Sequence, residues 1–267
     1  RETQARRATR KRKLDQYPRL REYVFAKLAL RWSPEQIAQV LRREFQRDEA
    51  MQISHESIYE YLYVLPRGEL KKTLVGYLRQ ERKARRKRTG LKEQRGKIPE
   101  MISIEERPAE VAQRSVPGHW EGDLLMGKDH RSALGTLVER TTRWVYLVPL
   151  KQKDASSVRK AFARTIKRLP KWLRKSMTYD QGREMAEHKL FTKKTEVKVY
   201  FAHPGSPWER GTNENTNGLI RQFFPKGTDF SKVPLSTIRW AERLLNGRPR
   251  KTLDFRTPKE ALTGLLR

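Results

Sequence analysis

The chain has 267 residues and carries 60 Lys and Arg against 31 Asp and Glu, a formal net charge of +29. Such an excess is typical of proteins that handle nucleic acid and unusual for soluble metabolic enzymes. The absence of cysteine excludes disulfide scaffolds, cysteine nucleophiles and Cys-ligated zinc, and it fits a reducing cytoplasm.

The length suits one large domain or two ordinary ones. A hydrophobic share of 36% supports a packed core and argues against wholesale disorder. No apolar run approaches the length of a membrane span, so we expect no membrane partner. The first residue is Arg rather than Met, and we therefore expect material missing upstream.

The N-terminal part predicts a basic arm over residues 1–16 and three short helices within residues 17–65. The segment SPEQIAQVLRREF begins with the pattern of a capping box, in which Ser33 caps the helix and Gln36 returns the bond. Three short helices with tight connections indicate a helix-turn-helix domain. The arm is either a solvated tail or a strap along phosphates, and both interpretations stay open.

The third predicted helix would enter the major groove and place His55, Ser57 and Tyr59 near base edges or phosphates. The alternative is a small helical bundle that only packs on its neighbours. Residues 66–118 predict a basic helical linker. Its densest positive run would track the DNA backbone through Arg85, Arg86, Lys87 and Arg88.

From His119 the sequence changes to short apolar segments rich in Val, Leu, Trp and Tyr. The predicted order over residues 119–228 is three strands, helix, strand, helix, strand, helix. This order predicts a mixed five-stranded α/β sheet with an antiparallel start. Residues 229–267 predict a C-terminal helical extension.

Three acidic residues stand out in this basic chain. Asp123 interrupts an otherwise apolar strand, and burying a carboxylate is costly unless it is paired or binds metal. Asp180 ends the strand SMTYD, and Glu214 follows after thirty-three intervening residues. Three converging carboxylates would bind Mg²⁺, with Mn²⁺ as a substitute, and two ions would suit phosphodiester chemistry.

The helix that carries Glu214 also predicts phosphate contacts. Asn217 and Arg221 fall at i+3 and i+7 from the glutamate, on one face. The preceding loop, AHPGSPWERG, offers Trp208 and Arg210 to grip a DNA strand by stacking and charge.

Other acids compete for these roles. Glu121 shares a strand face with Asp123 and either assists it or pairs with an arginine. Glu209 lies in a Pro- and Gly-containing loop, and for that reason we prefer Glu214. Glu184 is either an outer partner of the site or a helix N-terminal charge. His203 is expected to structure its loop or contact DNA rather than to bind metal.

These residues are similar to a known family. The segments HWEGDLLMGK, LVERTTRW, TYDQGREM and PGSPWERGTNENTNGLIRQFFPKGTDF resemble the insertion sequence thirty family of bacterial transposases, within the DDE transposase and retroviral integrase superfamily. The similarity extends over most of the chain from the helix-turn-helix onward. It implies a ribonuclease-H-like catalytic core over residues 119–228 that uses Mg²⁺, with Asp123, Asp180 and Glu214 as the catalytic carboxylates. It also implies an Arg or Lys one helical repeat after the glutamate, which here is Arg221.

The resemblance also implies a reaction and partners. Water would cleave double-stranded DNA at a transposon end, and the freed 3′-hydroxyl would attack target DNA. The helix-turn-helix would bind the terminal inverted repeats, and a homodimer or larger assembly would hold two ends. Two alternatives are a metal-dependent nuclease of the same fold and a DNA-binding regulator with an inactive catalytic domain.

Overall fold

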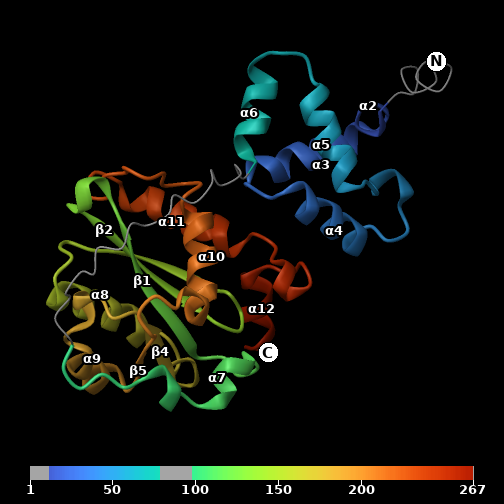
Figure 1. Ribbon diagram of the computed structural model, residues 1–267. Coiled ribbons are helices and arrows are strands. Elements are labelled where there is room, and N and C mark those ends of the chain that lie inside the picture. Colours follow the sequence, from blue (N-terminus) through green and yellow to red (C-terminus); the bar gives the residue numbers. More distant parts are fainter. Residues whose placement is uncertain (1–11, 79–97, 267) are drawn as a thin grey trace. The chain divides into compact units, whose positions relative to one another are not determined.

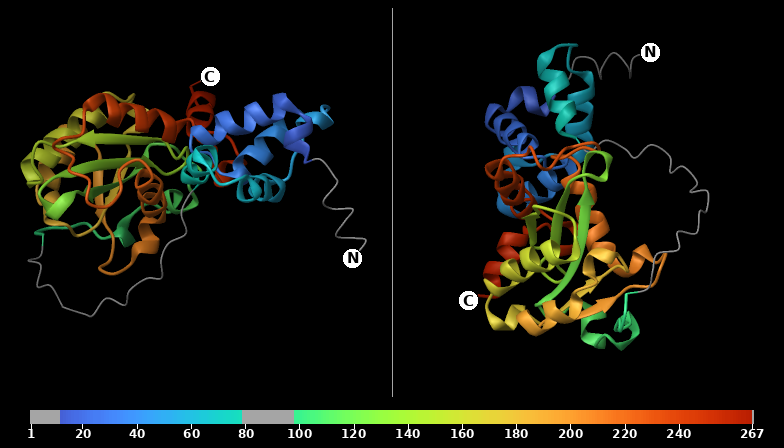
Figure 2. Two further views of the ribbon diagram at one scale, coloured as in Figure 1. Left: turned by 90° about the horizontal axis from the view of Figure 1, so that it is seen from above. Right: turned by 90° about the vertical axis from the view of Figure 1, so that its left-hand side faces the viewer.

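The computed structural model describes residues 12–78 and 98–266, which fall into two compact units (Figures 1 and 2). One unit contains the N-terminal helices together with Arg248–Thr257. The other contains the remaining described residues, including the sheet. The basic run Arg85–Arg88 lies outside the described residues, so its predicted DNA contacts have no structural counterpart here.

The helical unit is built from short amphipathic helices around one apolar core. Ser33 and Gln36 form the predicted capping box, and Ser54 accepts a hydrogen bond from the Ser57 amide. These contacts satisfy amide groups that a helix leaves free at its start. The helices are α2 (Lys13–Gln16), α3 (Pro18–Ala29), α4 (Pro34–Glu44), η1 (Glu49–Met51), α5 (His55–Val64) and α6 (Glu69–Tyr77).

The connection between α4 and α5 differs from the tight turn that the sequence predicted. It runs over residues 45–54 and includes the short helix η1. The Gln52 side chain donates to the carbonyls of Leu41 and Phe45, and Met51 is buried in the core. The connection is long because it satisfies the end of α4 and fills space between the helices, as a short turn could not.

A C-terminal segment completes this unit. Gln36 donates to the carbonyl of Pro249, and Arg43 donates to the carbonyl of Phe255 at 3.2 Å. Lys251 pairs with Glu35 at 2.9 Å. Residues 248–257 therefore belong structurally to α4, although more than two hundred positions separate them in the sequence.

The second unit is built on a five-stranded sheet in the order β3-β2-β1-β4-β5. The first three strands pair antiparallel, and β4 and β5 continue parallel to β1. This confirms the predicted mixed sheet of a ribonuclease-H-like core. The strands are β1 (His119–Met126), β2 (Ala133–Glu139), β3 (Val145–Pro149), β4 (Ser176–Tyr179) and β5 (Lys198–Phe201).

Helices cover both faces of the sheet, which explains why β2 is buried along its whole length (Figures 1 and 2). One core contains Phe162 from α8 (Ala155–Lys167) and Phe191 from α9 (His188–Thr195). The other contains Leu219 from α10 (Gly211–Ile220) and Leu245 from α11 (Leu235–Asn246). Along β1, Trp120 belongs to the first core and Leu125 to the second, so Glu121 and Asp123 face α10.

The segment before β1 is part of the sheet unit. Ile98 enters the core, and Ser103 forms a parallel bridge with Phe201 at the edge of the sheet. The remaining helices of this unit are η2 (Ile104–Glu106), α7 (Ala109–Gln113), η3 (Lys128–His130), η4 (Lys171–Leu173), η5 (Arg183–Met185), η6 (Pro207–Arg210) and α12 (Pro258–Gly264). None of the helices described is long and apolar enough to cross a membrane.

Candidate active site

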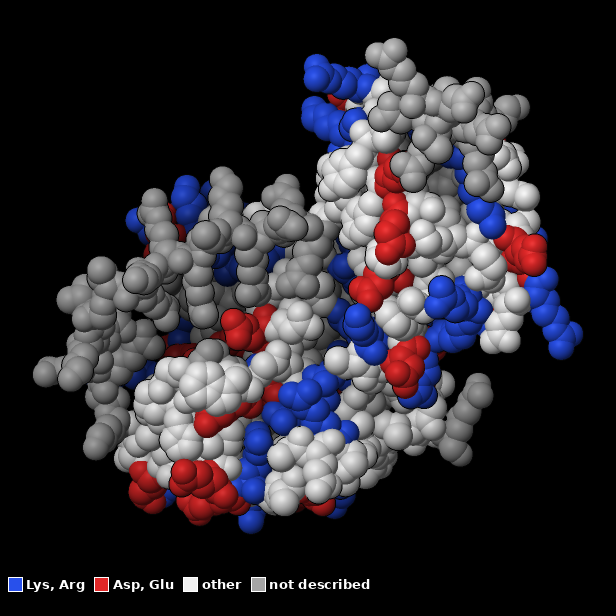
Figure 3. Space-filling model, turned by 45° about the vertical axis from the view of Figure 1, so that its right-hand side comes forward, with Lys and Arg blue, Asp and Glu red and all other residues white. Residues whose placement is uncertain are grey.

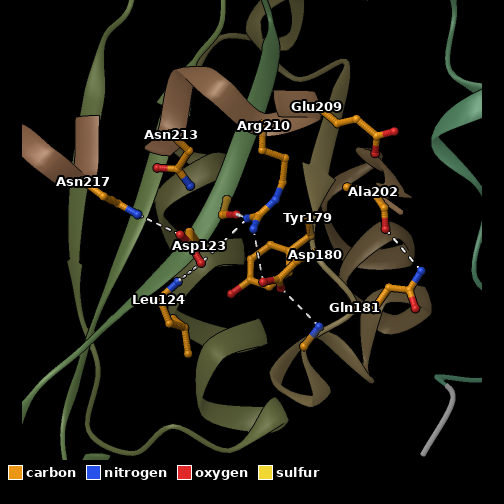
Figure 4. A network of polar contacts seen from close by, with 12 residues as sticks. Asp123, Leu124, Tyr179, Asp180, Gln181, Ala202, Glu209, Arg210, Asn213 and Asn217 are labelled. Atoms are coloured by element: carbon orange, nitrogen blue, oxygen red, sulfur yellow. Dashed lines mark hydrogen bonds and ion pairs between the residues drawn. The ribbon is translucent and has the colours of Figure 1, made fainter. Parts of the chain in front are cut away.

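Two carboxylates from neighbouring parallel strands meet beside the start of α10 (Figure 4). Asp123 lies on β1, and Asp180 directly follows β4. Asp180 Oδ1 accepts from the Gly182 amide at 3.1 Å, which fixes the carboxylate at the strand end. Because β1 and β4 run parallel, the two acids come together although fifty-six residues separate them in the sequence.

A single guanidinium lies between these carboxylates. Arg210 Nη2 is 3.1 Å from Asp180 Oδ2, and Arg210 Nη1 is 3.7 Å from Asp123 Oδ1. Nη1 also donates to the carbonyl of Gly122 at 3.1 Å. Arg210 immediately precedes α10, so the helix start delivers one positive charge to the point where the two acids converge.

The Asp123 carboxylate is held on its other side by α10. Asn217 Nδ2 donates to Asp123 Oδ2 at 2.7 Å, and the Leu124 amide donates to Oδ1 at 2.9 Å. Four helical residues earlier, the Asn213 amide donates to Glu121 Oε2 at 2.7 Å. Four helical residues rise about 6 Å and two strand residues about 7 Å, so both contacts fit one helix lying along β1.

Burial raises the pKa of Asp123 from 3.8 to about 6. Arg210 opposes this rise, whereas the negative charges of Asp180 and Glu184 add to it. Glu184 is anchored by the Tyr179 hydroxyl, which donates to it at 3.4 Å. Asp123 and Asp180 therefore share the charge of one guanidinium, an arrangement that favours binding a cation.

Glu214 does not join this network. It is exposed on α10, and the structure gives its carboxylate no hydrogen bond or ion pair within the described residues. Asn213 and Asn217 face the strand instead. Among the described residues, no three Asp, Glu or His side chains converge closely enough to hold a metal ion.

The other residues predicted to bind DNA lie in different settings. Arg221 donates to the carbonyl of Met126 at 2.8 Å and faces the end of β1. Trp208 is 72% exposed in the loop before α10. In the helical unit, His55 and Tyr59 are partly exposed and Ser57 is exposed on α5.

The loop that carries Trp208 and Arg210 is closed by His203 and Glu209. The Glu209 carboxylate accepts from the His203 amide and lies 2.8 Å from His203 Nδ1. This contact raises the pKa of His203 and lowers that of Glu209. Glu209 thus has a structural partner, in agreement with the loop role expected for His203.

Glu121 pairs with Arg140, the second of the two possibilities that the sequence left open. Both side chains are buried, with Glu121 at 0% and Arg140 at 3% exposure. Arg107, Arg114 and Arg143 lie near Arg140, and none of these four arginines was expected from the sequence to be part of the site. Arg140 ends the mostly apolar segment ALGTLVER, and a charged residue beside an apolar strand is the same sequence signal that indicated Asp123.

Comparison with known proteins agrees with this geometry. Residues 113–207 match the family described as "Integrase core domain", which covers Asp123 and Asp180 and ends before Glu214. The fold and the paired aspartates thus define a protein of the integrase-core class, whose members generally use divalent metal ions.

The curated relatives narrow the class. The chain is 47% identical over 236 residues to the transposase for insertion sequence element IS1086 of Cupriavidus metallidurans, covering 88% of this chain and 70% of that protein. It is 45% identical to transposase InsI for insertion sequence element IS30A of Escherichia coli, covering 93% and 66% respectively. A transposase for IS4351 of Bacteroides fragilis is 40% identical over 91% of this chain and 72% of that protein. The chain belongs to the insertion sequence thirty family of transposases.

Proposed function

We propose that this chain cleaves DNA at the ends of a mobile element and joins the freed 3′-hydroxyl to target DNA. The observation that carries the proposal is the pair Asp123 and Asp180 with a cationic group between them (Figure 4). The guanidinium stands where a divalent cation would bind both carboxylates. Carboxylate oxygens are the ligands that Mg²⁺ and Mn²⁺ prefer.

Asp123 and Asp180 would supply two of the three metal ligands, and Glu214 would be the third. Its helix is already fixed on β1 through Asn213 and Asn217. The exposed carboxylate on that helix has freedom to turn when cation and DNA enter. Bound metal would supply Lewis acidity to the attacking and leaving oxygens of each phosphodiester step.

The protein residues would then have separate tasks. Asn217 holds the Asp123 carboxylate in orientation, and the Gly182 amide holds that of Asp180. Exposed Trp208 is suited to stack on an unpaired base near the cleavage point. Arg221, Arg210 and the α5 residues His55, Ser57 and Tyr59 are proposed to contact DNA once it is bound, with double-stranded transposon ends and target as substrates.

The critical experiment compares wild type with Asp180→Asn on a duplex bearing an element end. Wild type should release a 3′-hydroxyl and, given a pre-cut end, form a joined product. Asp180→Asn should lose both activities by at least about a hundredfold. Joining at the wild-type level by Asp180→Asn would refute the metal site, whereas cleavage without joining would favour a nuclease.

The location of bound metal provides an independent test. A crystal soaked in Mn²⁺ should show the ion between Asp123 and Asp180, with the Arg210 side chain moved away. Density elsewhere in the sheet unit would contradict the assignment. The same crystal would show whether Glu214 turns inward as the third ligand.

A further inference from the structure

Four arginines gather around one buried glutamate, on the side of the sheet that faces α10. On the face drawn in Figure 3, Lys and Arg side chains and Asp and Glu side chains form separate small clusters. The net charge of the chain therefore does not by itself locate a DNA-binding surface. A local excess of one sign is more informative, and one such excess of positive charge near the candidate active site surrounds Glu121.

Two of these arginines, Arg140 and Arg107, are tied to the surroundings of Glu121 by direct contacts. Arg140 forms the ion pair with Glu121 itself. Arg107 donates to the Thr178 hydroxyl at 3.0 Å, and Thr178 is the register partner of Glu121 across β1 and β4.

Arg143 and Arg114 are the other two members of this group of four arginines. Arg143 donates to the Thr212 hydroxyl at 2.5 Å, one residue before the amide that binds Glu121. Arg114 directly follows α7, and the carbonyl of Val111 in that helix accepts from Arg140 Nε.

The positive charges in this group exceed the available negative ones. Glu139 is occupied, because its two carboxylate oxygens accept from the amides of Gly118, Thr141 and Thr142. Glu209 is bound to His203. Within residues 12–78 and 98–266, Glu121 is the carboxylate whose charge acts on all three of Arg107, Arg140 and Arg143, and Glu139 acts in addition on Arg143.

Burial and mutual repulsion both disfavour the charged form of these arginines. Burial lowers the pKa of Arg107 and Arg143 and brings that of Arg140 to about 10, and the charge of Arg114 adds to each decrease. The Nε of Arg143 is buried and has no hydrogen-bond acceptor among the described residues. Partly buried cations that outnumber their counter-ions are unfavourable unless an anion joins them.

We propose that Arg107, Arg114 and Arg143 form a binding site for a phosphate group of the DNA backbone, with Arg140 and Glu121 as its fixed base. The proposal rests on the proposed function and specifies how the substrate is held. Glu121 and Asp123 are two residues apart on β1, about 7 Å. That equals the rise of about two nucleotides along one strand, so the bound phosphate would flank the reacting bond.

Arg114→Gln gives a sharp test, because binding and stability should change in opposite directions. Within the part of the chain that the structure describes, the Arg114 side chain makes no hydrogen bond, and its charge repels three neighbours. The metal-free variant should therefore unfold at the same temperature as wild type or higher. Its affinity for a mixed-sequence DNA duplex should fall about three- to tenfold, with the logarithmic salt dependence reduced by about one.

Arg159→Gln is the matched control. Arg159 forms a partly buried ion pair with Glu187 on the face covered by α8 and α9. Arg159→Gln removes the same charge as Arg114→Gln. The variant should be less stable than wild type because its ion pair with Glu187 is broken, and the salt dependence of its duplex binding should equal that of wild type. A direct probe is inorganic phosphate, which should raise the melting temperature of wild type above that in chloride of equal ionic strength, but not that of Arg114→Gln.

Equal duplex affinity and salt dependence for wild type and Arg114→Gln would overturn the phosphate site. Loss of stability together with unchanged binding would also overturn it and assign Arg114 a structural role. If wild type itself bound no duplex, the proposed function would fail instead. The two failures are thus distinguishable in one titration series.

Discussion

Replacing Asp123 by Asn should stabilise the metal-free protein, and the gain should depend on pH. Burial raises the pKa of Asp123 from 3.8 to about 6, and its side chain is 23% exposed. Between these two pH values the folded chain holds a proton that the unfolded chain has released. Wild-type stability therefore falls as pH rises through this window, whereas Asp123→Asn lacks this loss.

The size of the effect follows from the shift. A rise from 3.8 to about 6 corresponds to about 3 kcal/mol once both states are ionised. The amide offers one acceptor oxygen to Asn217 and Leu124 in place of two, a cost of about 1 kcal/mol that does not vary with pH. The net gain at about pH 8 is then about 2 kcal/mol, and about 1.4 kcal/mol of the ionisation effect develops between about pH 5 and 8.

Urea unfolding of both proteins with a chelator present, at several pH values, measures this difference. Asp154→Asn is the control, because Asp154 caps α8 and its pKa is lowered by hydrogen bonds with Ser157. Its contribution is present above pH 3.8, so its loss should be constant over the same range. A stability difference for Asp123→Asn that does not change with pH would refute the argument from burial.

Three further predictions concern contacts around the site. Arg210→Gln should bind Mn²⁺ about tenfold more tightly than wild type by calorimetry, since the cation no longer competes with a guanidinium; weaker binding would contradict this. Glu139→Gln should lower stability by about 2 kcal/mol in urea unfolding, because an amide nitrogen would face backbone donors; an unchanged midpoint would exclude it. NMR titration should give His203 a pKa above 6.5 in wild type and a pKa closer to 6.5 in Glu209→Gln, and equal pKa values in the two proteins would refute the contact. The contact between His203 and Glu209 should therefore be present at pH 6.5, be lost as pH rises through the raised pKa of His203, and weaken as pH falls through the lowered pKa of Glu209.

The sheet could be predicted from the sequence because each strand is short, apolar and bounded by polar turns. The segments around Trp120, Leu137 and Met177 are buried as expected. The capping box at Ser33 was also predictable, because its residues are three positions apart and act locally. By contrast, the length of the α4–α5 connection depends on Gln52 and Met51 meeting partners elsewhere in the unit, which local patterns do not reveal.

The sequence by itself showed which charged residues lie within apolar segments, and on that ground it identified Asp123 as a candidate site residue. Only the tertiary structure decided its partners, because Arg210, Asn217 and Asp180 come from elements distant in sequence that meet through the parallel pairing of β1 with β4 and the packing of α10. The same holds for the arginines around Glu121, which come from separate segments. Charge acts through space and not along the chain, so its balance at any point is fixed only after the chain has folded.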